Sequence, residues 1–481
     1  MAMIVAACDK PDIIPGGGDG PDPADTTQTP VTPTDSIPAK PAGRWDDTGA
    51  DVPDWPTYNA VSKLADFPRV DVVTGDGRAI TDKNNYKVGT ITFKDPAKMY
   101  SDSTLLSVPM QIRGRGNTSW NAEGGLKNSY RVKLDTKHKV FGMSGDRDWI
   151  LLADVKDGTL LRNAVSQRIA RLVSMPWSPR FRAVELYVNG SYAGCYTLFE
   201  QKETGTSKVN VTPMAPTDSE GGFFIELDNK DDEDKYFRST YFDKKIKFKD
   251  PDFADLAAKK LNDSSVPGAV FIMNQVNTLE RLLSEEKFDK ETGYWAYAEV
   301  ITFVRNFIVQ ELTRNPDGNM RLSTYFAKDA DTKLFMPMCW DFDLALGNTR
   351  SMQGEYYVDT SEPEGWWVKD YGDYPYIWEH NRPTYYQYMF RDPQFVQLLQ
   401  QEWETVKPRL DKIPAFIDKM YEYDKLAFAH NDSAGFAPYI SSYGGEDYNV
   451  KHYSTHDSAV KALKDFYTKR LVWMDTAIKN L

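Results

Sequence analysis

Two carboxylates separated by one residue stand out as possible metal ligands in the segment Trp340-Asp341-Phe342-Asp343. The segment follows an expected strand, and both side chains can reach one divalent cation if the backbone turns there. Mg²⁺ is commonly held by one or two carboxylates together with the phosphate oxygens of a substrate. An Asp-x-Asp pair is too short to be specific, so the segment indicates a metal site only in combination with other residues.

An earlier loop, 314–319, carries another acidic side chain, Asp317. An Asp in such a loop can accept the proton of a hydroxyl nucleophile. The order of loop Asp, hairpin and metal-binding Asp is the order in which a protein-kinase-like domain presents its catalytic parts. Asp and Asn are also common turn formers in a loop with Pro and Gly. The order of the motifs, more than the loop alone, therefore favours phosphoryl transfer.

Phosphoryl transfer also needs fixed positive charge on the nucleotide phosphates, and one strand upstream offers it. Residues 130–134 alternate strictly, which places Arg131 and Lys133 on one face of that strand. Lys127 joins this face if the strand begins that early. The Gly-rich run 113–120, which begins with Arg113, looks like a turn close to phosphates. A lone lysine on a strand is more often simply solvated, so the sequence leaves open which group contacts phosphate.

The secondary structure expected around these residues changes along the chain. Residues 45–203 indicate mainly short strands, with one helix over 161–172 and a hairpin whose turn is Asn189-Gly190. After residue 250, apolar side chains recur at helical spacing, which predicts an amphipathic helix over 272–283 and a second helix over 300–312 that is apolar enough to lie in a core. The pattern predicts an α+β protein with a β-rich first part and a mainly helical second part.

Several short motifs occur along the chain and are specific as a set. In order they are Arg113-Gly-Arg-Gly-Asn-Thr-Ser-Trp120, Lys127-Asn-Ser-Tyr-Arg-Val-Lys-Leu-Asp135, Trp149-Ile-Leu-Leu-Ala153, Leu161-Arg-Asn163, Leu186-Tyr-Val-Asn-Gly190, Glu200-Gln201, Gly221-Gly-Phe-Phe-Ile-Glu-Leu-Asp228 and Trp340-Asp-Phe-Asp343. Together they resemble the CotH kinase family, named for a spore-coat protein, in the form found as surface lipoproteins of Bacteroides-like bacteria. The resemblance covers roughly residues 60–350.

The resemblance implies an atypical two-lobed kinase-like fold that binds ATP and Mg²⁺ (or Mn²⁺) and phosphorylates Ser or Thr of proteins. It gives Asp317 the catalytic-loop role and Asp341 the metal-binding role, with Asp343 as a second candidate ligand. The residues that it places at the cofactor are Lys127, Arg131, Lys133 and Arg113 near the phosphates and Glu200 near the adenine. Ser323-Thr324 stand where the family often has an Asn metal ligand, which keeps open a nucleotide-binding but inactive protein.

The amino-terminal residues predict an address in the cell envelope. Residues 1–8 end in a short apolar run and Cys8, like a truncated lipoprotein signal whose cysteine carries the lipid. Residues 9–44 are rich in Pro, Gly and Thr and are expected to form a flexible tether. These features predict a protein anchored by lipid at the outer membrane or cell surface, with membrane contact only through that anchor. We expect a β-rich N-lobe over 45–203 and a C-lobe over 204–390, completed by the helical residues 391–481.

Composition excludes several other classes of protein. The 481 residues carry a net charge of −12, which argues against a nucleic-acid partner. Three cysteines are too few for a disulfide scaffold or a Cys-rich zinc module. The motifs of serine hydrolases, zinc metalloproteases and P-loop nucleoside triphosphatases do not occur in the sequence.

Two other functions remain open from the sequence alone. The segment 356–390 holds twelve aromatic residues, including Trp366 and Trp367. Such rings can bind a glycan or a protein partner, which would make the chain a non-catalytic surface adhesin, or they can pack the segment onto its neighbours. An ATP-using transferase of another kind, such as an adenylylating enzyme, is also possible on the same fold.

Overall fold

The computed structural model describes most of the chain after residue 60. The described residues are 48–49, 61–100, 104–116, 120, 127–228, 234–316, 318, 320, 322–349, 359–370, 384–436 and 450–481. All of them belong to one unit, Ala39–Leu481. Among the described helices, none combines the length and the apolar character needed to cross a bilayer.

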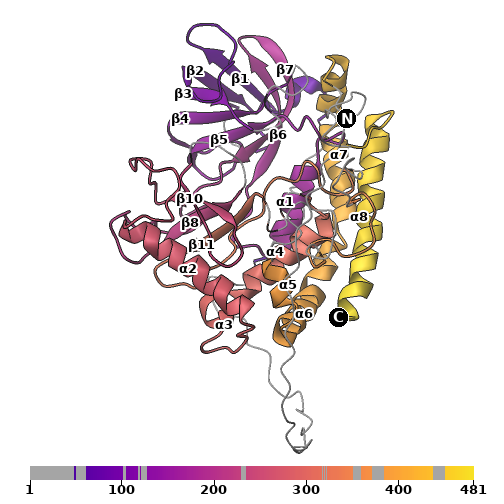
Figure 1. The fold of residues 1–481 in the computed structure, drawn as a ribbon. Helices are drawn as coiled ribbons and strands as arrows, with labels where there is room; N and C mark the ends of the chain where they lie inside the picture. The colour runs from indigo at the N-terminus through magenta and orange to yellow at the C-terminus, as the bar shows by residue number, and fades with distance from the viewer. Residues whose placement is uncertain are drawn as a thin grey trace, which may run out of the picture. The chain divides into compact units, whose positions relative to one another are not determined.

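Seven strands close into a barrel in the order β1-β2-β3-β4-β5-β7-β6 (Figure 1). They are β1 (Arg69–Thr74), β2 (Lys87–Lys94), β3 (Leu105–Gly114), β4 (Tyr130–His138), β5 (Asp146–Leu152), β6 (Phe181–Val188) and β7 (Ser191–Glu200). The parallel pairing of β1 with β6 closes the barrel, and the neighbouring strands pair antiparallel. Asn189 and Gly190 have φ angles of 50° and 83°, as the two-residue turn of the β6–β7 hairpin requires.

Strand β4 confirms the alternation seen in the sequence. Tyr130, Val132 and Leu134 are buried, whereas Arg131 and Lys133 are partly exposed on the opposite face. The strand begins at Tyr130, so Lys127 lies before it and does not share this face by strand geometry.

A second sheet has the order β11-β8-β10-β9 and two unlike faces. Its strands are β8 (Phe223–Leu227), β9 (Tyr236–Arg238), β10 (Lys245–Asp250) and β11 (Thr324–Lys328). Ile225 pairs with Phe326 and Phe248, and these three side chains are buried on the apolar face. Glu226 pairs with Tyr325 and Lys247 on the opposite, polar face. The apolar face packs on helices, whereas the charged side chains lie on the polar face.

Helices make up most of the rest of the chain. They are α1 (Arg162–Leu172), α2 (Pro267–Ser284), α3 (Tyr294–Tyr297), α4 (Val300–Thr313), α5 (Tyr385–Met389), α6 (Pro393–Leu410), α7 (Ile413–Ser433) and α8 (His456–Lys479), besides the short 3-10 helix η1 (Leu64–Asp66). Every residue of α4 is buried, and this helix contacts α1, α6 and α8. Helix α7 contacts β6, β7 and α8, and α7 and α8 run side by side in Figure 1. The α+β prediction and the helices expected near 161–172, 272–283 and 300–312 are confirmed.

Candidate functional site

The backbone turns at Asp341, which is the condition for two carboxylates to share a cation. Asp341 has a φ of 70°, in the left-handed region that Asp tolerates better than most residues. The side-chain amide of Asn315 donates to the Asp341 carbonyl (3.0 Å), and the next backbone N–H, of Phe342, donates to Asn163 Oδ1 (2.9 Å). Phe342 is buried, whereas Asp341 and Asp343 are partly exposed. The turn therefore presents both carboxylates at the surface while its backbone is held from two sides.

A cation from the Gly-rich run lies close to Asp341. The Arg115 guanidinium is 6.0 Å from the centre of the Trp340 ring, and it interacts electrostatically with Asp341. Burial lowers the pKa of Arg115, and the negative charge of Asp341 opposes that shift. The Asp341 carboxylate also accepts a hydrogen bond from Ser323 Oγ (3.2 Å).

A second cation, Lys202, approaches the same ring from the end of β7. Lys202 Nζ is 5.8 Å from the Trp340 ring centre and 2.9 Å from Glu226 Oε1. It also donates to the hydroxyl of Tyr325, which in turn donates to Glu226. Burial lowers the pKa of Lys202, and the Glu226 charge opposes the shift. Lys202 is thus held over the aromatic rings in a fixed position.

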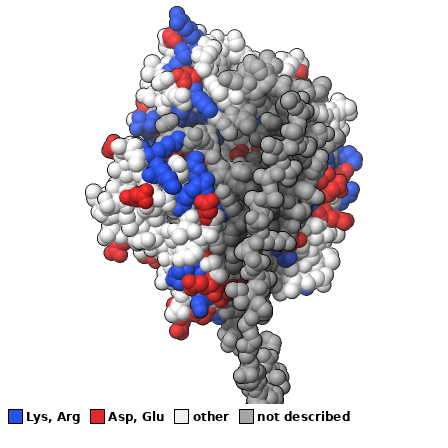
Figure 2. Space-filling view, viewed as in Figure 1, with Lys and Arg blue, Asp and Glu red and all other residues white. Residues whose placement is uncertain are grey.

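Glu226 balances this arrangement from the polar face of the second sheet. Its Oε2 is 3.4 Å from Lys249 Nζ, which also bonds Asp234 (2.8 Å). Burial alone would raise the pKa of Glu226, but the charges of Lys202 and Lys249 outweigh burial and hold that pKa well below its ordinary value. We call Arg115, Lys202, Glu226, Lys249, Tyr325 and Asp341 the junction cluster, since barrel residues and second-sheet residues meet in it. Figure 2 shows Lys and Arg gathered on part of the face in view.

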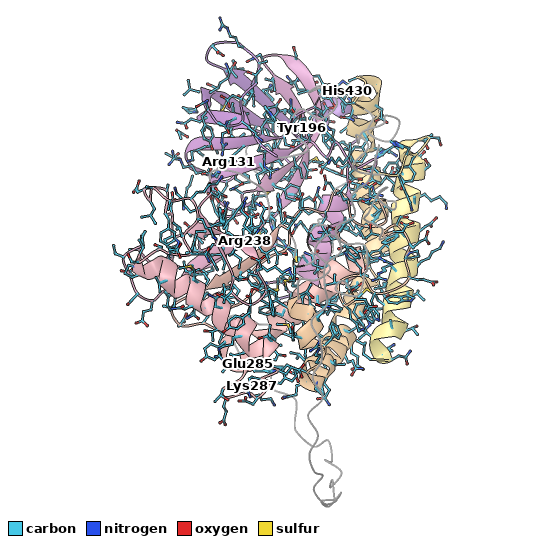
Figure 3. All side chains as sticks on the ribbon, in the orientation of Figure 1. Arg131, Tyr196, Arg238, Glu285, Lys287 and His430 are labelled. Atoms are coloured by element: carbon cyan, nitrogen blue, oxygen red, sulfur yellow. The ribbon has the colours of Figure 1, made fainter. Side chains whose placement is uncertain are left out.

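The cations predicted on β3 and β4 lie on the barrel, and two of them, Arg113 and Arg131, contact barrel residues. Arg131, labelled in Figure 3, donates to Asp148 Oδ1 through Nε and Nη2 (3.2 and 2.9 Å). Arg113 donates to the Lys83 carbonyl and lies 5.0 Å from the Tyr86 ring centre. Lys133 is partly exposed on the same face of β4 as Arg131.

Lys127 is buried in a different environment. Its Nζ donates to the Cys195 carbonyl (2.5 Å) and lies 4.9 Å from the Tyr196 ring centre. Burial lowers the pKa of Lys127 to about 8, and the charges of Asp154 and Asp432 oppose the shift. The structure therefore brings Lys127 to strand β7 and to Asp154, and does not group it with the cations around Trp340.

Glu200, which the family resemblance placed near the adenine, is fully buried and accepts hydrogen bonds from two backbone N–H groups. Its Oε2 accepts the Arg180 N–H (2.8 Å) and its Oε1 accepts the Ser144 N–H (3.3 Å). The side chain joins the loops that lead into β5 and β6.

Two predicted residues lie outside the described part of the chain, namely Asp317 and Cys8. The loop of Asp317 is nevertheless linked to the turn, because Asn315 bonds the Asp341 carbonyl.

The two described tryptophans of the aromatic segment pack against helices. Trp367 is 4% exposed, and its indole N–H donates to the Asn315 carbonyl (2.8 Å). The ring of Trp366 lies 5.1 Å from that of Trp473 on α8. Of the two arrangements expected for these rings, packing onto neighbouring elements is the one found at both positions.

A comparison with protein-family models now bears on this geometry. The family described as CotH kinase protein matches residues 112–474, which is most of the chain. The chain belongs to the CotH kinase family. A comparison with curated proteins gave no match. Membership implies a kinase-like fold and supports phosphoryl transfer as the class of reaction.

The donors at the turn suit the metal that a kinase uses with ATP. No group of three or more His, Cys, Asp or Glu side chains suited to a metal occurs among the described residues. Asp341 and Asp343 supply two carboxylates, and Mg²⁺ takes its remaining ligands from phosphate oxygens and water. Two carboxylates alone would leave positions for phosphate oxygens in the coordination of Mg²⁺.

The sequence analysis did not predict Arg115 and Lys202, the two cations beside the Trp340 ring. Arg115 stands inside the Gly-rich motif that was recognised, but alternation does not apply in a turn, so its direction was not predictable. Lys202 comes directly after Glu200-Gln201, beyond the end of β7. The available signal was their position inside or beside motifs, and it did not distinguish them from neighbouring Lys and Arg residues.

Proposed function

We propose that the chain is an ATP- and Mg²⁺-dependent phosphotransferase that phosphorylates Ser or Thr of a protein. The observation that carries the proposal is the position of Asp341, on a turn fixed by Asn163 and Asn315, beside two cations that share the Trp340 ring. Catalysis of phosphoryl transfer consists mainly of positioning and of stabilising charge on the phosphates. A carboxylate pair with adjoining cations supplies both functions.

Each side chain has a separate role in the proposal. Asp341 and Asp343 hold Mg²⁺, while Arg115 and Lys202 contact the phosphates. Bound Mg²⁺ supplies positive charge to the phosphate oxygens of ATP. Asp317 orients the acceptor hydroxyl and takes its proton, as the order of the motifs suggests. Glu226 keeps Lys202 charged and in place, since a buried ammonium without a carboxylate would tend to lose its proton.

The kinase-like fold of the family suggests where these parts belong. We propose that the barrel corresponds to the N-lobe and the second sheet with the helices to the C-lobe, so that the junction cluster lies in the nucleotide cleft. The sequence adds a proposed location. A lipid on Cys8 would hold the protein at the cell envelope, which makes an envelope or surface protein the proposed acceptor.

A nucleotide-binding but inactive protein is the second candidate. Ser323-Thr324 stand where the family often has an Asn, and Ser323 Oγ lies 3.2 Å from Asp341 Oδ2. A hydroxyl is a weaker Mg²⁺ ligand than an amide carbonyl, which favours reduced turnover.

Thermal unfolding with and without Mg-ATP tests the proposal. At about 100 times its dissociation constant, the nucleotide should add about 2.7 kcal/mol to the free energy of unfolding. A folded protein that shows no shift with metal present would contradict nucleotide binding.

Phosphate transfer separates the two candidates. Labelled phosphate should appear on a casein-like acceptor, and transfer should vanish in Asp317→Ala and Asp341→Ala. Binding without transfer would identify the inactive form. Release of pyrophosphate in place of ADP would identify adenylylation.

A further inference from the structure

The backbone between the two carboxylates is held by a side chain of α1. Phe342 N–H donates to Asn163 Oδ1 (2.9 Å), and Asn163 is only 6% exposed. Because the backbone group can only donate, the amide oxygen of Asn163 must face it. The amide nitrogen of Asn163 then points away from the Phe342 backbone.

Asp154 accepts a hydrogen bond from that nitrogen. Asn163 Nδ2 donates to Asp154 Oδ1 (2.8 Å), and Thr197 Oγ1 donates to Asp154 Oδ2 (2.7 Å). Asp154 is 5% exposed and has a φ of 49°, in the left-handed region. Both carboxylate oxygens thus have donors, and the one on Oδ1 sets the orientation of Asn163.

The charge of Asp154 is supported from the barrel side. Burial raises the pKa of Asp154 to about 7, as does the charge of Asp157, whereas Lys127 and the two hydrogen bonds lower it.

We infer that Asp154 is a positioning residue for the metal-binding turn, acting through Asn163 to fix the backbone between Asp341 and Asp343. The inference rests on the proposed function for the part in which these two carboxylates hold metal. Groups that orient metal ligands without touching the metal commonly change metal affinity about 10–100-fold when they are removed.

The far end of the same segment is held independently. Arg162 Nε donates to the Ala345 carbonyl (3.1 Å), and Asn348 Nδ2 donates to the carbonyls of Lys156 (2.8 Å) and Asp343 (2.6 Å). These bonds do not involve Asp154. Loss of the Asp154 carboxylate should therefore loosen the turn locally while leaving the segment folded.

Mn²⁺ binding in the presence of a non-hydrolysable ATP analogue, followed by electron paramagnetic resonance, tests the inference on the full chain. Asp154→Ala should weaken Mn²⁺ binding about 10-fold. Asp154→Asn should restore most of the affinity, because its amide oxygen can accept from Asn163 Nδ2 while its amide nitrogen donates to Thr197. The matched control, Thr197→Val, removes only the bond to Oδ2 and should change the affinity by less than about threefold.

A double-mutant cycle sharpens the result. Asn163→Leu should weaken Mn²⁺ binding about as much as Asp154→Ala, and the double variant should lose little more, since both changes remove the same constraint. Unchanged affinity in Asp154→Ala, or additive losses in the cycle, would overturn the inference. A loss that Asp154→Asn does not restore would assign the effect to charge and would also overturn it.

Hydrogen exchange separates failure of the inference from failure of the proposed function. If the wild-type protein binds no Mn²⁺ with nucleotide, the proposed function fails, but the amide of Phe342 still reports on the turn. Its exchange should be about 10-fold faster in Asp154→Ala and unchanged in Thr197→Val. Equal exchange in Asp154→Ala and the wild type would overturn the positioning role.

Discussion

Two lysines lie beside the barrel, Lys127 buried and Lys202 partly exposed, and their surroundings are opposite in kind. Lys202 has Glu226 at 2.9 Å and two aromatic rings beside its ammonium. Lys127 has a backbone carbonyl at 2.5 Å and only a longer-range attraction to Asp154. Burial lowers the pKa of both, to about 8 for Lys127.

The difference shows that burial of a lysine is not a sign of function by itself. Lys202 is held by a carboxylate within reach of Asp341 and Trp340, so its charge can act on a ligand there. Lys127 is held by backbone between β7 and α7, so its charge acts within the fold. The comparison makes predictions that differ for the two residues.

The largest difference should appear in catalysis. Lys202→Met removes a fixed cation from the proposed phosphate site, and phosphate transfer should fall about 100-fold or more, with the Mg-ATP thermal shift lost. Lys127→Met should change the rate of phosphate transfer by less than about threefold and should keep the Mg-ATP thermal shift, since its ammonium lies outside the junction cluster. Transfer rates and thermal shifts of the two variants, measured side by side, check this. The reverse pattern would assign the phosphate contact to Lys127, one of the residues that the family resemblance placed near the phosphates.

The partner of Lys202 should matter most for stability. Glu226→Gln leaves Lys202 and Lys249, which are both partly exposed, without their shared carboxylate and should lower the free energy of unfolding by about 3 kcal/mol at pH 7.

The pH dependence of the Glu226 effect follows from its lowered pKa. The folded pKa lies below the unfolded value of 4.5, so the stabilisation is full above that value and is lost as the pH falls through the folded pKa. Urea unfolding at pH 7 and pH 3 should show the gap between wild type and variant narrowing in acid. A gap that widens in acid would contradict the ion-pair account.

Lys127 should show its pH dependence in the alkaline range. Its pKa is about 8 in the folded protein against 10.5 unfolded, so the unfolded state binds more protons between these values. Stability due to this group therefore rises with pH across that window, by about 3 kcal/mol in total. Subtracting the pH profile of Lys127→Met from that of the wild type isolates the contribution. A flat difference would mean that the ammonium is not buried in solution.

A buried acid without a pair gives a smaller effect. Asp424 on α7 is 1% exposed, and neither carboxyl oxygen has a hydrogen-bond partner among the described residues. Burial raises its pKa well above the ordinary value.

Because burial raises its pKa, the folded protein holds the Asp424 proton more tightly than the unfolded chain, and the wild type loses stability as the pH rises from about 4. Asp424→Asn carries no such cost and should gain about 1 kcal/mol over the wild type at pH 8, less at pH 4. Chemical denaturation at both values measures the difference. A larger gain at pH 4 would refute the assignment.

The smallest effect belongs to Lys133. This side chain is partly exposed on β4, so Lys133→Ala should change the free energy of unfolding by less than about 0.5 kcal/mol. The nucleotide affinity of the Lys133→Ala variant should also stay close to that of the wild type. Loss of nucleotide binding in this variant would move the phosphate contact to β4, which is where the strand alternation placed it.

The sequence was most informative where local chemistry sets the structure. The alternation of β4, the Asn189-Gly190 turn and the buried helix α4 follow from periodicity and turn preference, and all were predictable. Asp341 was recognised because two carboxylates in a short motif suggest a metal. The pairing of Lys202 with Glu226 was not predictable, since it joins the end of a barrel strand to a different sheet. Likewise, the link from Asp154 through Asn163 to Phe342 spans three separate segments that only the tertiary fold brings together.

A crystal structure with a bound Mg-ATP analogue tests the central claim most directly. Our account predicts triphosphate density within hydrogen-bonding distance of Lys202 and Arg115, with the metal on Asp341. Density for the triphosphate beside Lys127, or elsewhere on the barrel away from Trp340, would contradict it.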